Sequence, residues 1–422
     1  MKKLLSQYAG LKKEIYILFI GKVVTAMGSF VWPMLTFFLT RKLGLSDGVS
    51  TLIIATANTL AFPAAIIGGK LADKFSRKSI IVIFDIITVS FYILSAILPI
   101  GYHTAVFVFV AGLFQTVESP AYDALNSDFS STSERERAFS LSYLGYNLGF
   151  VVGAALSGIL FEKYTSVAFL ANGLAILAST LLIAFFVDMK NTVSESADGE
   201  QNENYSEYER PIPADTPVLA VLRERRVVLW MLLISCIASM PNTLMGLLLP
   251  LQLKESLGEL GSAVYGYLNS LNGLTVIILT PVLTLLLRRF TEIPKTVAGL
   301  MFFLFGTAIF STDGAVWLMF LGMFVFTIGE VVTVLGDNPY GSRRIPASHR
   351  GRVGGVTSVV YSVFASLTQY LISFILMITE NNYMLIWWIF IGVGLAAAVL
   401  FVMMYRPDRK MFPKLYSDTD IL

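Results

Sequence analysis

The stretch that decides the fold spans residues 69–78 and reads Gly-Lys-Leu-Ala-Asp-Lys-Phe-Ser-Arg-Lys. Apolar residues fill positions 49–67 before it and positions 80–100 after it. Hydrocarbon does not hold unpaired charges at this density, because each ionised side chain would have to leave water. The charged turn is therefore expected at a membrane surface, between two helices that cross the bilayer. Gly68 and Gly69 have no side chains, so a further helix can approach closely there.

The composition is that of a membrane protein that crosses the bilayer many times. Hydrophobic residues make up 55% of the 422 residues and charged residues only 14%, a balance outside that of soluble domains. We identify twelve apolar segments of about 20 residues, the length that a spanning helix needs. They are 14–40, 49–69, 79–100, 104–125, 138–161, 166–187, 227–252, 262–287, 296–312, 315–337, 353–379 and 384–405. The sequence therefore predicts an all-α membrane protein.

The lysine and arginine residues divide unevenly between alternate loops. With the N-terminus in the cytoplasm, 26 of the 31 basic residues fall in inside segments. Four fall outside, namely Arg41, Lys42, Lys163 and Lys254, and Lys22 remains within the first helix. Since cytoplasmic loops carry the excess of basic residues, both termini are predicted to be cytoplasmic.

Residues 188–217 form the one long polar stretch and are rich in Glu, Asp, Asn and Ser. Such a segment cannot bury enough apolar area to order itself, so it is predicted to be a flexible linker. The expected domains are an N-terminal six-helix bundle over 1–187, a cytoplasmic linker over 188–222 and a C-terminal six-helix bundle over 223–422.

Four ionisable residues fall inside predicted spans, where an unpaired charge is costly and marks a functional candidate: Lys22, Asp85, Glu118 and Glu330. A shift of 212 residues carries Glu118 onto Glu330, as a parallel repeat would. A carboxyl in a cavity can exchange protons and attract a cation, although a neutral carboxyl that only ties helices together is the alternative. Lys22 and Asp85 lie at similar depths and would form a switchable buried pair, unless Lys22 extends to the membrane surface.

The 69–78 stretch resembles the loop between helices 2 and 3 of the major facilitator superfamily, with the pattern Gly-x-Leu-Ala-Asp-Arg-x-Gly-Arg-Lys. The matching residues are Gly69, Leu71, Ala72, Asp73, Arg77 and Lys78, with Lys74 in place of Arg and Ser76 in place of Gly. Asp128 and Arg137 resemble the Asp and Arg that follow helix 4 in many members. The resemblance implies that Asp73, Arg77, Asp128 and Arg137, with Gly69, form a cytoplasmic gate.

Glycines recur in the fifth predicted span at Gly145, Gly149, Gly153 and Gly158, the first three at intervals of four residues. Such spacing gives one smooth face for close helix packing. It resembles the glycine-rich antiporter signature of drug exporters, although Phe150 replaces the central proline and any contact face would look alike. Tyr146 and Asn147 are expected to face a binding cavity.

The segment Thr327-Ile328-Gly329-Glu330 resembles helix 10 of proton-coupled multidrug antiporters, in which the glutamate takes part in coupling. The resemblance covers nearly the whole chain and implies the twelve-helix fold of two six-helix bundles, alternating access, and proton-coupled efflux of amphipathic, cationic drug-like compounds. The positions that resemble the membrane acids of helices 5 and 7 hold Ser142 and Gly246, a departure from that pattern. The alternatives are carriage of a specific solute, such as a peptide, lipid-linked molecule or siderophore, and a sensor or scaffold without transport.

Other classes of function lack their signatures in this sequence. The single cysteine, Cys236, excludes an internal disulfide and a cysteine metal cluster, and no Gly-x-x-x-x-Gly-Lys-Ser/Thr motif for ATP is present. We expect no enzyme activity, no catalytic residues, no metal and no cofactor. The expected partners are a small-molecule substrate, protons and the lipid bilayer, without nucleic acid. The expected setting is a monomer that spans the plasma membrane of a bacterium many times.

Overall fold

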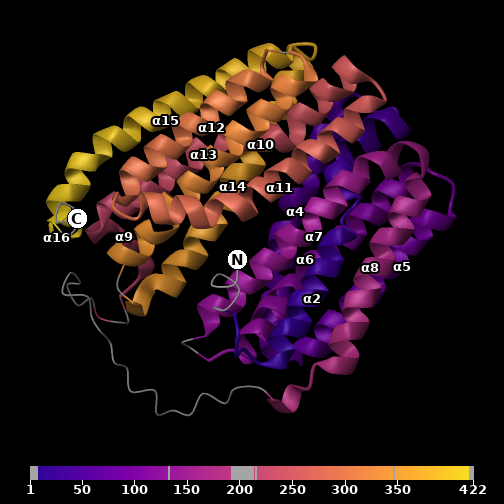
Figure 1. Ribbon diagram of the computed structural model, residues 1–422, viewed down its shortest axis with the longest axis horizontal. Helices are drawn as coiled ribbons and strands as arrows, with labels where there is room; N and C mark the ends of the chain where they lie inside the picture. Colours follow the sequence, from indigo (N-terminus) through magenta and orange to yellow (C-terminus); the bar gives the residue numbers. More distant parts are fainter. Residues whose placement is uncertain are drawn as a thin grey trace. The chain divides into compact units, whose positions relative to one another are not determined.

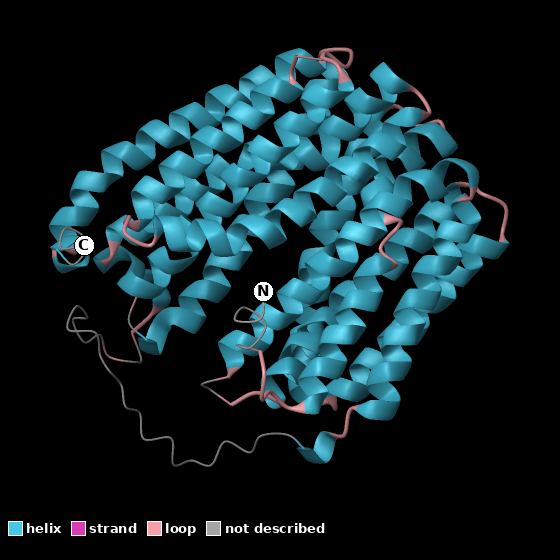
Figure 2. Ribbon diagram, in the orientation of Figure 1, coloured by secondary structure: helices cyan, strands magenta, loops and turns pink. Residues whose placement is uncertain are grey.

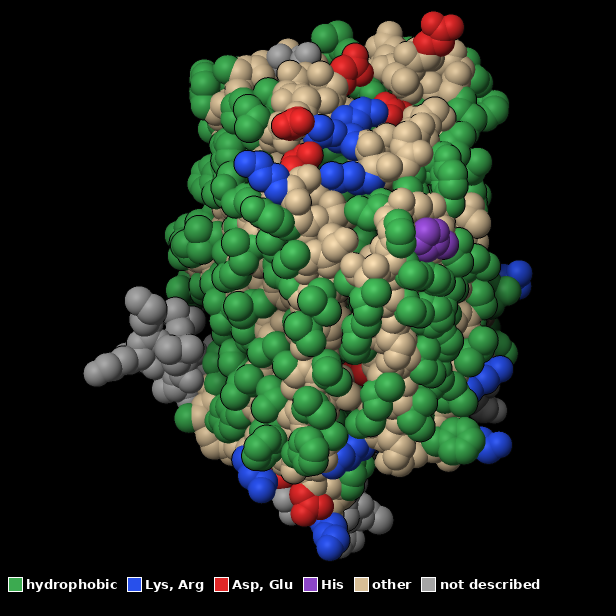
Figure 3. Space-filling view, turned by 90° about the vertical axis from the view of Figure 1, so that its right-hand side faces the viewer, with side chains coloured by type: hydrophobic (Ala, Val, Ile, Leu, Met, Phe, Trp, Pro, Cys, Tyr) green, Lys and Arg blue, Asp and Glu red, His purple; other side chains and the backbone are tan. Residues whose placement is uncertain are grey.

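The computed structural model describes residues 8–131, 134–191, 213, 216–312, 314–345 and 347–417. This described part contains helices and loops and no strands (Figure 2). Twelve of its helices are long and apolar enough to cross a membrane, which confirms the predicted number and helical class. On the face drawn in Figure 3, hydrophobic side chains form a broad band and charged side chains gather mainly toward its two ends. A bilayer-spanning protein is expected to distribute its side chains in this way.

Two compact units divide the described chain. Unit 1 comprises the described residues up to 191 together with residues 253–274. Unit 2 comprises residues 213 and 216–252 together with the described residues of 275–417. The boundary therefore cuts through the helices α10 (Arg226–Leu257) and α11 (Leu260–Leu287). The predicted bundles are continuous in sequence, whereas unit 1 also includes the tip of the hairpin that α10 and α11 form in the second half of the chain. Most of the predicted linker lies outside the described residues.

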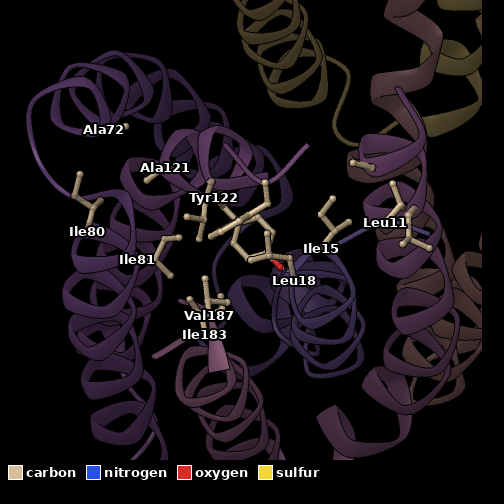
Figure 4. Packing of buried hydrophobic residues seen from close by; sticks show 14 residues of the cluster. Leu11, Ile15, Leu18, Ala72, Ile80, Ile81, Ala121, Tyr122, Ile183 and Val187 are labelled. Atoms are coloured by element: carbon tan, nitrogen blue, oxygen red, sulfur yellow. Dashed lines mark hydrogen bonds between the residues drawn. The ribbon is translucent and has the colours of Figure 1, made fainter. Parts of the chain in front are cut away.

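Unit 1 is built on helices that pack in pairs (Figure 1). Its long helices are α2 (Lys13–Met27), α4 (Asp47–Lys74), α5 (Arg77–Ile97), α6 (Tyr102–Asp128), α7 (Arg135–Lys163) and α8 (Thr165–Phe186). Helix α2 packs against α7 and α8, α5 packs against α6 and α8, and α4 packs against α6. Buried apolar side chains, including Leu18, Ile81 and Ile183, gather where these helices meet (Figure 4). This core positions the functional residues that lie along the same helices.

The first membrane span differs from the continuous helix predicted over 14–40. Helix α2 ends at Met27, and the chain continues through η1 (Trp32–Met34), α3 (Leu35–Phe37) and the π-helical η2 (Phe38–Lys42). Pro33 lies in η1 and has no backbone N–H to continue an α-helix. The carboxamide oxygen of Asn172 in α8 accepts hydrogen bonds from the backbone N–H groups of Phe30 and Val31, at 3.2 and 3.4 Å. A break within a membrane span is tolerated when such partners satisfy its backbone.

Replacing Asn172 by leucine is expected to lower the free energy of unfolding by about 2 kcal/mol, because two buried N–H donors lose their acceptor. The thermal unfolding of the purified protein in detergent measures the change. Asn269→Leu is the matched control, since the buried Asn269 amide bonds only to Tyr265 of its own helix. Equal losses in the two variants would show that Asn172 does not stabilise the break.

The hairpin tip at 253–274 is held within unit 1 by polar contacts. Arg41 pairs with Glu162 at 2.5 Å, and the Ser262 hydroxyl donates to the same carboxylate at 2.8 Å. Lys254 pairs with Asp47. Arg41 and Lys254 are two of the four basic residues that the sequence assigned to the outer surface. The tip therefore has its own attachment to the N-terminal helices.

Unit 2 contains the rest of the long helices. They are α10 as far as residue 252, α11 from residue 275, α12 (Glu292–Phe310), α13 (Val316–Arg344), α14 (Ala347–Ile378) and α15 (Tyr383–Met411), with the short helices α9 (Val218–Glu224) and α16 (Lys414–Ser417). Helix α12 packs against α13 and α15. Gly299 of α12 and Gly329 of α13 permit close approach, because a Cβ on Gly299 would lie 2.9 Å from the Gly329 oxygen.

A fully buried arginine ties three helices of unit 2 together. Arg344, at the end of α13, forms a bidentate pair with Asp408 of α15, with atom distances of 2.9 and 2.6 Å. Its third contact is Glu292 of α12 at 3.2 Å, and its guanidinium carbon lies 3.9 Å from the centre of the Tyr340 ring. The Tyr340 hydroxyl donates to Asp408 at 2.7 Å. The three charged side chains thus satisfy one another away from solvent.

Candidate functional site

Lys22 lies inside unit 1, over an aromatic ring. Its ammonium nitrogen is 4.7 Å from the centre of the Tyr122 ring of α6. Tyr122 is itself buried, and its hydroxyl donates to the backbone oxygen of Leu18, one turn before Lys22 on α2 (Figure 4). A cation over a desolvated ring is stabilised by about 2 kcal/mol. The ring therefore gives Lys22 a fixed position at the α2–α6 contact.

Three carboxyl groups lie close enough to this ammonium to interact with its charge. Asp85 of α5 and Glu118 and Asp123 of α6 all interact electrostatically with Lys22. Asp85 is buried and accepts a hydrogen bond from the Thr180 hydroxyl of α8 at 2.6 Å, whereas Glu118 is half-buried and Asp123 is exposed. When all three carboxyls are ionised, their combined negative charge exceeds the single positive charge of Lys22. The cluster can therefore take up protons or an external cation.

The cluster brings together three of the residues that the sequence singled out, Lys22, Asp85 and Glu118. Lys22 and Asp85 are electrostatic neighbours, but their direct partners are the Tyr122 ring and Thr180 rather than each other. Sequence reasoning did not include Tyr122 or Thr180. Tyr122 follows Glu118 by four residues and so shares its helix face, which is a readable signal. Nothing near Thr180 in the sequence marks it.

Helix α7 packs its glycines against the helix that carries Lys22. A Cβ on Gly149 would overlap the backbone oxygen of Val23, and one on Gly153 would lie 2.6 Å from the Ala26 oxygen. Gly145 lies against the Phe19 ring. Gly158 instead faces Ser262 in the hairpin tip. Close contact along three helical turns fixes the depth of α2, and with it the depth of Lys22.

Tyr146 and Asn147 of α7 differ in their surroundings. The Tyr146 side chain is 43% exposed and stacks on Phe150 with ring centres 5.7 Å apart. Asn147 is buried, and its amide donates to the backbone oxygen of Tyr143 on the same helix at 2.9 Å. Tyr146 thus offers an aromatic surface, while one end of the Asn147 amide is occupied within α7.

The predicted gate residues divide between two ion pairs. Arg77 pairs with Asp128 and also donates to the Ala124 oxygen at 3.2 Å. Arg137 approaches Glu134 at 3.7 Å, and hydrogen bonds from the Ser131 hydroxyl and backbone N–H lower the pKa of Glu134.

Asp73 lies exposed near the end of α4. The helix stops at Lys74 and α5 begins at Arg77, so Asp73 and Arg77 do not share a helix face. A Cβ on Gly69 would meet open space, whereas one on Gly68 would overlap the Val117 backbone oxygen of α6. The close approach of α4 to α6 is therefore made by Gly68.

Glu330 lies half-buried on α13 in unit 2. Seven residues further along the same helix, Asp337 accepts a hydrogen bond from the Thr296 hydroxyl of α12 at 2.9 Å. The sequence analysis did not single out Asp337, because Asp337 is the last residue of the predicted span 315–337. Both units therefore carry membrane carboxyls, at Asp85 and Glu118 in unit 1 and at Glu330 and Asp337 in unit 2.

Comparison with known proteins identifies a family and several similar carriers. The family model described as Major Facilitator Superfamily matches residues 18–369. A Na⁺, Li⁺, K⁺/H⁺ antiporter of Planococcus maritimus is 24% identical over 79% of this chain and 82% of its own. The quinolone resistance protein NorA of Staphylococcus aureus is 25% identical over 44% of this chain and 48% of its own.

Solved structures of two other transporters resemble this fold. The POT family transporter PepTSo superimposes with a TM-score of 0.73 at 15% identity, covering 94% of this chain and 98% of its own. The nucleoside transporter NupG gives a TM-score of 0.72 at 12% identity, covering 93% of this chain and all of its own. At such identities the likeness establishes the twelve-helix transporter fold alone.

Proposed function

Because the chain belongs to the Major Facilitator Superfamily, we propose that it is a secondary transporter that exports amphipathic cationic compounds in exchange for protons. It works by alternating access, as a monomer in the plasma membrane of a bacterium, with both termini cytoplasmic. The observation that carries this proposal is the cluster of Asp85, Glu118 and Asp123 around Lys22. Its excess of acid suits protons and cations as exchanging ligands.

Three members of the cluster have distinct parts in the exchange. Glu118 is half-buried and interacts with the charge of Lys22 on α2. We assign to it the loading and release of the proton. Asp85 is held by Thr180 and keeps the local charge negative. Lys22 cancels one of the three negative charges, so that one proton together with one monovalent cation neutralises the remaining two. Tyr146 supplies an exposed aromatic surface for the apolar part of a substrate.

Two relatives support the proposal at the level of transport class. The NorA protein is named for quinolone resistance, and the Planococcus protein is named an antiporter of alkali cations and protons. The second name makes alkali cation/proton exchange our second candidate, since that relative aligns with 79% of the chain. Carboxylate oxygens, which the cluster supplies, are ligands that hard cations prefer. Carriage of a specific solute and sensing without transport remain the other possible outcomes.

Proteoliposomes with an imposed pH gradient test the proposal. We expect export of a cationic dye such as ethidium by the purified protein, and at least a tenfold slower rate in Glu118→Gln, because the amide cannot carry a proton. Glu330→Gln tests the corresponding carboxyl in unit 2 in the same way. Glu255→Gln is the matched control, since Glu255 is exposed and outside the cluster.

The outcomes separate the candidate functions. Dye export that requires Glu118 supports drug/proton antiport. Collapse of the pH gradient by Na⁺ or K⁺ without dye export supports the second candidate. Full activity of Glu118→Gln in both assays would contradict the role given to the cluster.

A further inference from the structure

Helices α10, α13 and α14 of unit 2 line a cavity that none of the residues discussed for transport explains. Its volume is about 270 Å³. The apolar part of the wall includes Val228, Met231 and Val353, and the polar part consists of Ser235, Asp337, Asn338, Thr357 and Tyr361 with the backbone. Pockets for drug-sized molecules measure about 300–1,000 Å³. This cavity lies below that range, and at roughly 30 Å³ for each water it suits a small hydrated ligand.

The carboxyl of Asp337 faces this cavity without a basic residue. Among the described residues, no lysine, arginine or histidine lines the cavity. The hydrogen bond from Thr296 supplies a neutral donor only. By contrast, Glu292 and Asp408 in the same unit both pair with Arg344. A carboxylate inside a membrane span is stabilised by a positive partner, and at Asp337 a cation from outside the chain can supply it.

The Ser235 hydroxyl adds a neutral oxygen ligand to the same cavity. Ser235 is 4% exposed and lines the cavity. Its oxygen lies within hydrogen-bonding reach of both Asp337 and Tyr361. A cation in the cavity would be coordinated by the Ser235 oxygen and the Asp337 carboxylate together.

We propose that this cavity binds one monovalent alkali cation, with the Asp337 carboxylate as its charged ligand. The Ser235 and Tyr361 hydroxyl oxygens and waters complete the coordination. Hard cations take oxygen ligands of this kind. A single carboxylate balances a single charge, whereas protein sites for Ca²⁺ use several carboxylate and carbonyl oxygens. The site deepens the proposed antiporter function, on which its role in transport rests, by adding an ion site in unit 2.

Thermal unfolding of the full-length protein in detergent tests the site. NaCl, LiCl and KCl are compared with N-methyl-D-glucamine chloride at equal ionic strength and pH. We expect at least one alkali cation to raise the Tm in a saturable manner. Asp337→Asn is expected to abolish the rise, and Ser235→Ala to weaken the apparent affinity several-fold. Glu255→Gln, which changes a carboxyl elsewhere to an amide, should leave the titration unchanged.

Three results would overturn the proposal: no saturable rise with any alkali cation, the same rise in Asp337→Asn, or a rise with ethidium that requires Asp337 while alkali cations give none. If Asp337→Asn does not fold, an unchanged affinity in Ser235→Ala overturns the proposal instead. The measurement uses no pH gradient. Loss of dye export in proteoliposomes therefore bears on the proposed function and leaves the binding result as it stands.

Discussion

Replacing Arg344 by methionine is expected to lower the free energy of unfolding by about 3–5 kcal/mol. The side chain is fully buried and pairs with both Asp408 and Glu292, which are themselves buried. Methionine has a similar length but no charge, so Asp408 would remain away from water without a cation, and Glu292 would keep only its contact with Arg343. Removal of one partner from a buried ionic group costs more than the group contributes when intact, because desolvated charge is left behind.

Arg343 offers a control one residue away. Its guanidinium also contacts Glu292, at 2.7 Å, but its side chain is 57% exposed. Arg343→Met should therefore change the free energy of unfolding by no more than about 1 kcal/mol. Thermal unfolding of both variants in the same detergent makes the comparison. If the two substitutions destabilise the protein equally, burial does not control the strength of this network.

Replacing Gly68 by alanine is expected to destabilise the protein by about 1–3 kcal/mol. The added Cβ would overlap the backbone oxygen of Val117, so α4 and α6 would have to separate. A backbone atom cannot rotate away as a flexible side chain can. The substitution therefore acts on the packing of two helices rather than on one rotamer.

Gly69→Ala is expected to stabilise the protein, in contrast to Gly68→Ala. A Cβ at Gly69 would meet nothing within 4 Å, and alanine is a better helix former than glycine by about 1 kcal/mol. Differential scanning fluorimetry of Gly68→Ala and Gly69→Ala, measured side by side, tests the pair. A stabilised Gly68→Ala variant would contradict the close approach of α4 and α6.

The twelve membrane spans could be predicted because the bilayer imposes length and hydrophobicity on each one separately. The break after Met27 could not be predicted in this way, since residues 23–40, on both sides of the break, carry no charge. Pro33 is visible in the sequence, but a proline within a helix can either kink it or interrupt it. The partner that makes the break tolerable is Asn172, which lies about 140 residues away and has no local signal.

The candidate site could be predicted in part, for a similar reason. Lys22, Asp85 and Glu118 stand out because charge is rare within apolar segments. The network of Arg344 with Glu292 and Asp408 did not stand out, because each member lies at the edge of a span. Arg344 contributed to the topology as one more basic loop residue. Which edge residues pair depends on tertiary packing, which no local pattern records.

The division of α10 and α11 between the two units has a mechanical consequence. Each helix belongs to one body over part of its length and to the other body beyond it. Any relative rotation of the bodies must then be absorbed by bending near residues 252 and 274, where the division falls. Pro250 and Gly273, each within two residues of these positions, lower the stiffness of the backbone there. We therefore expect the hairpin to bend near residues 252 and 274 during transport, and rigidifying either position should slow the transport cycle more than it changes substrate affinity.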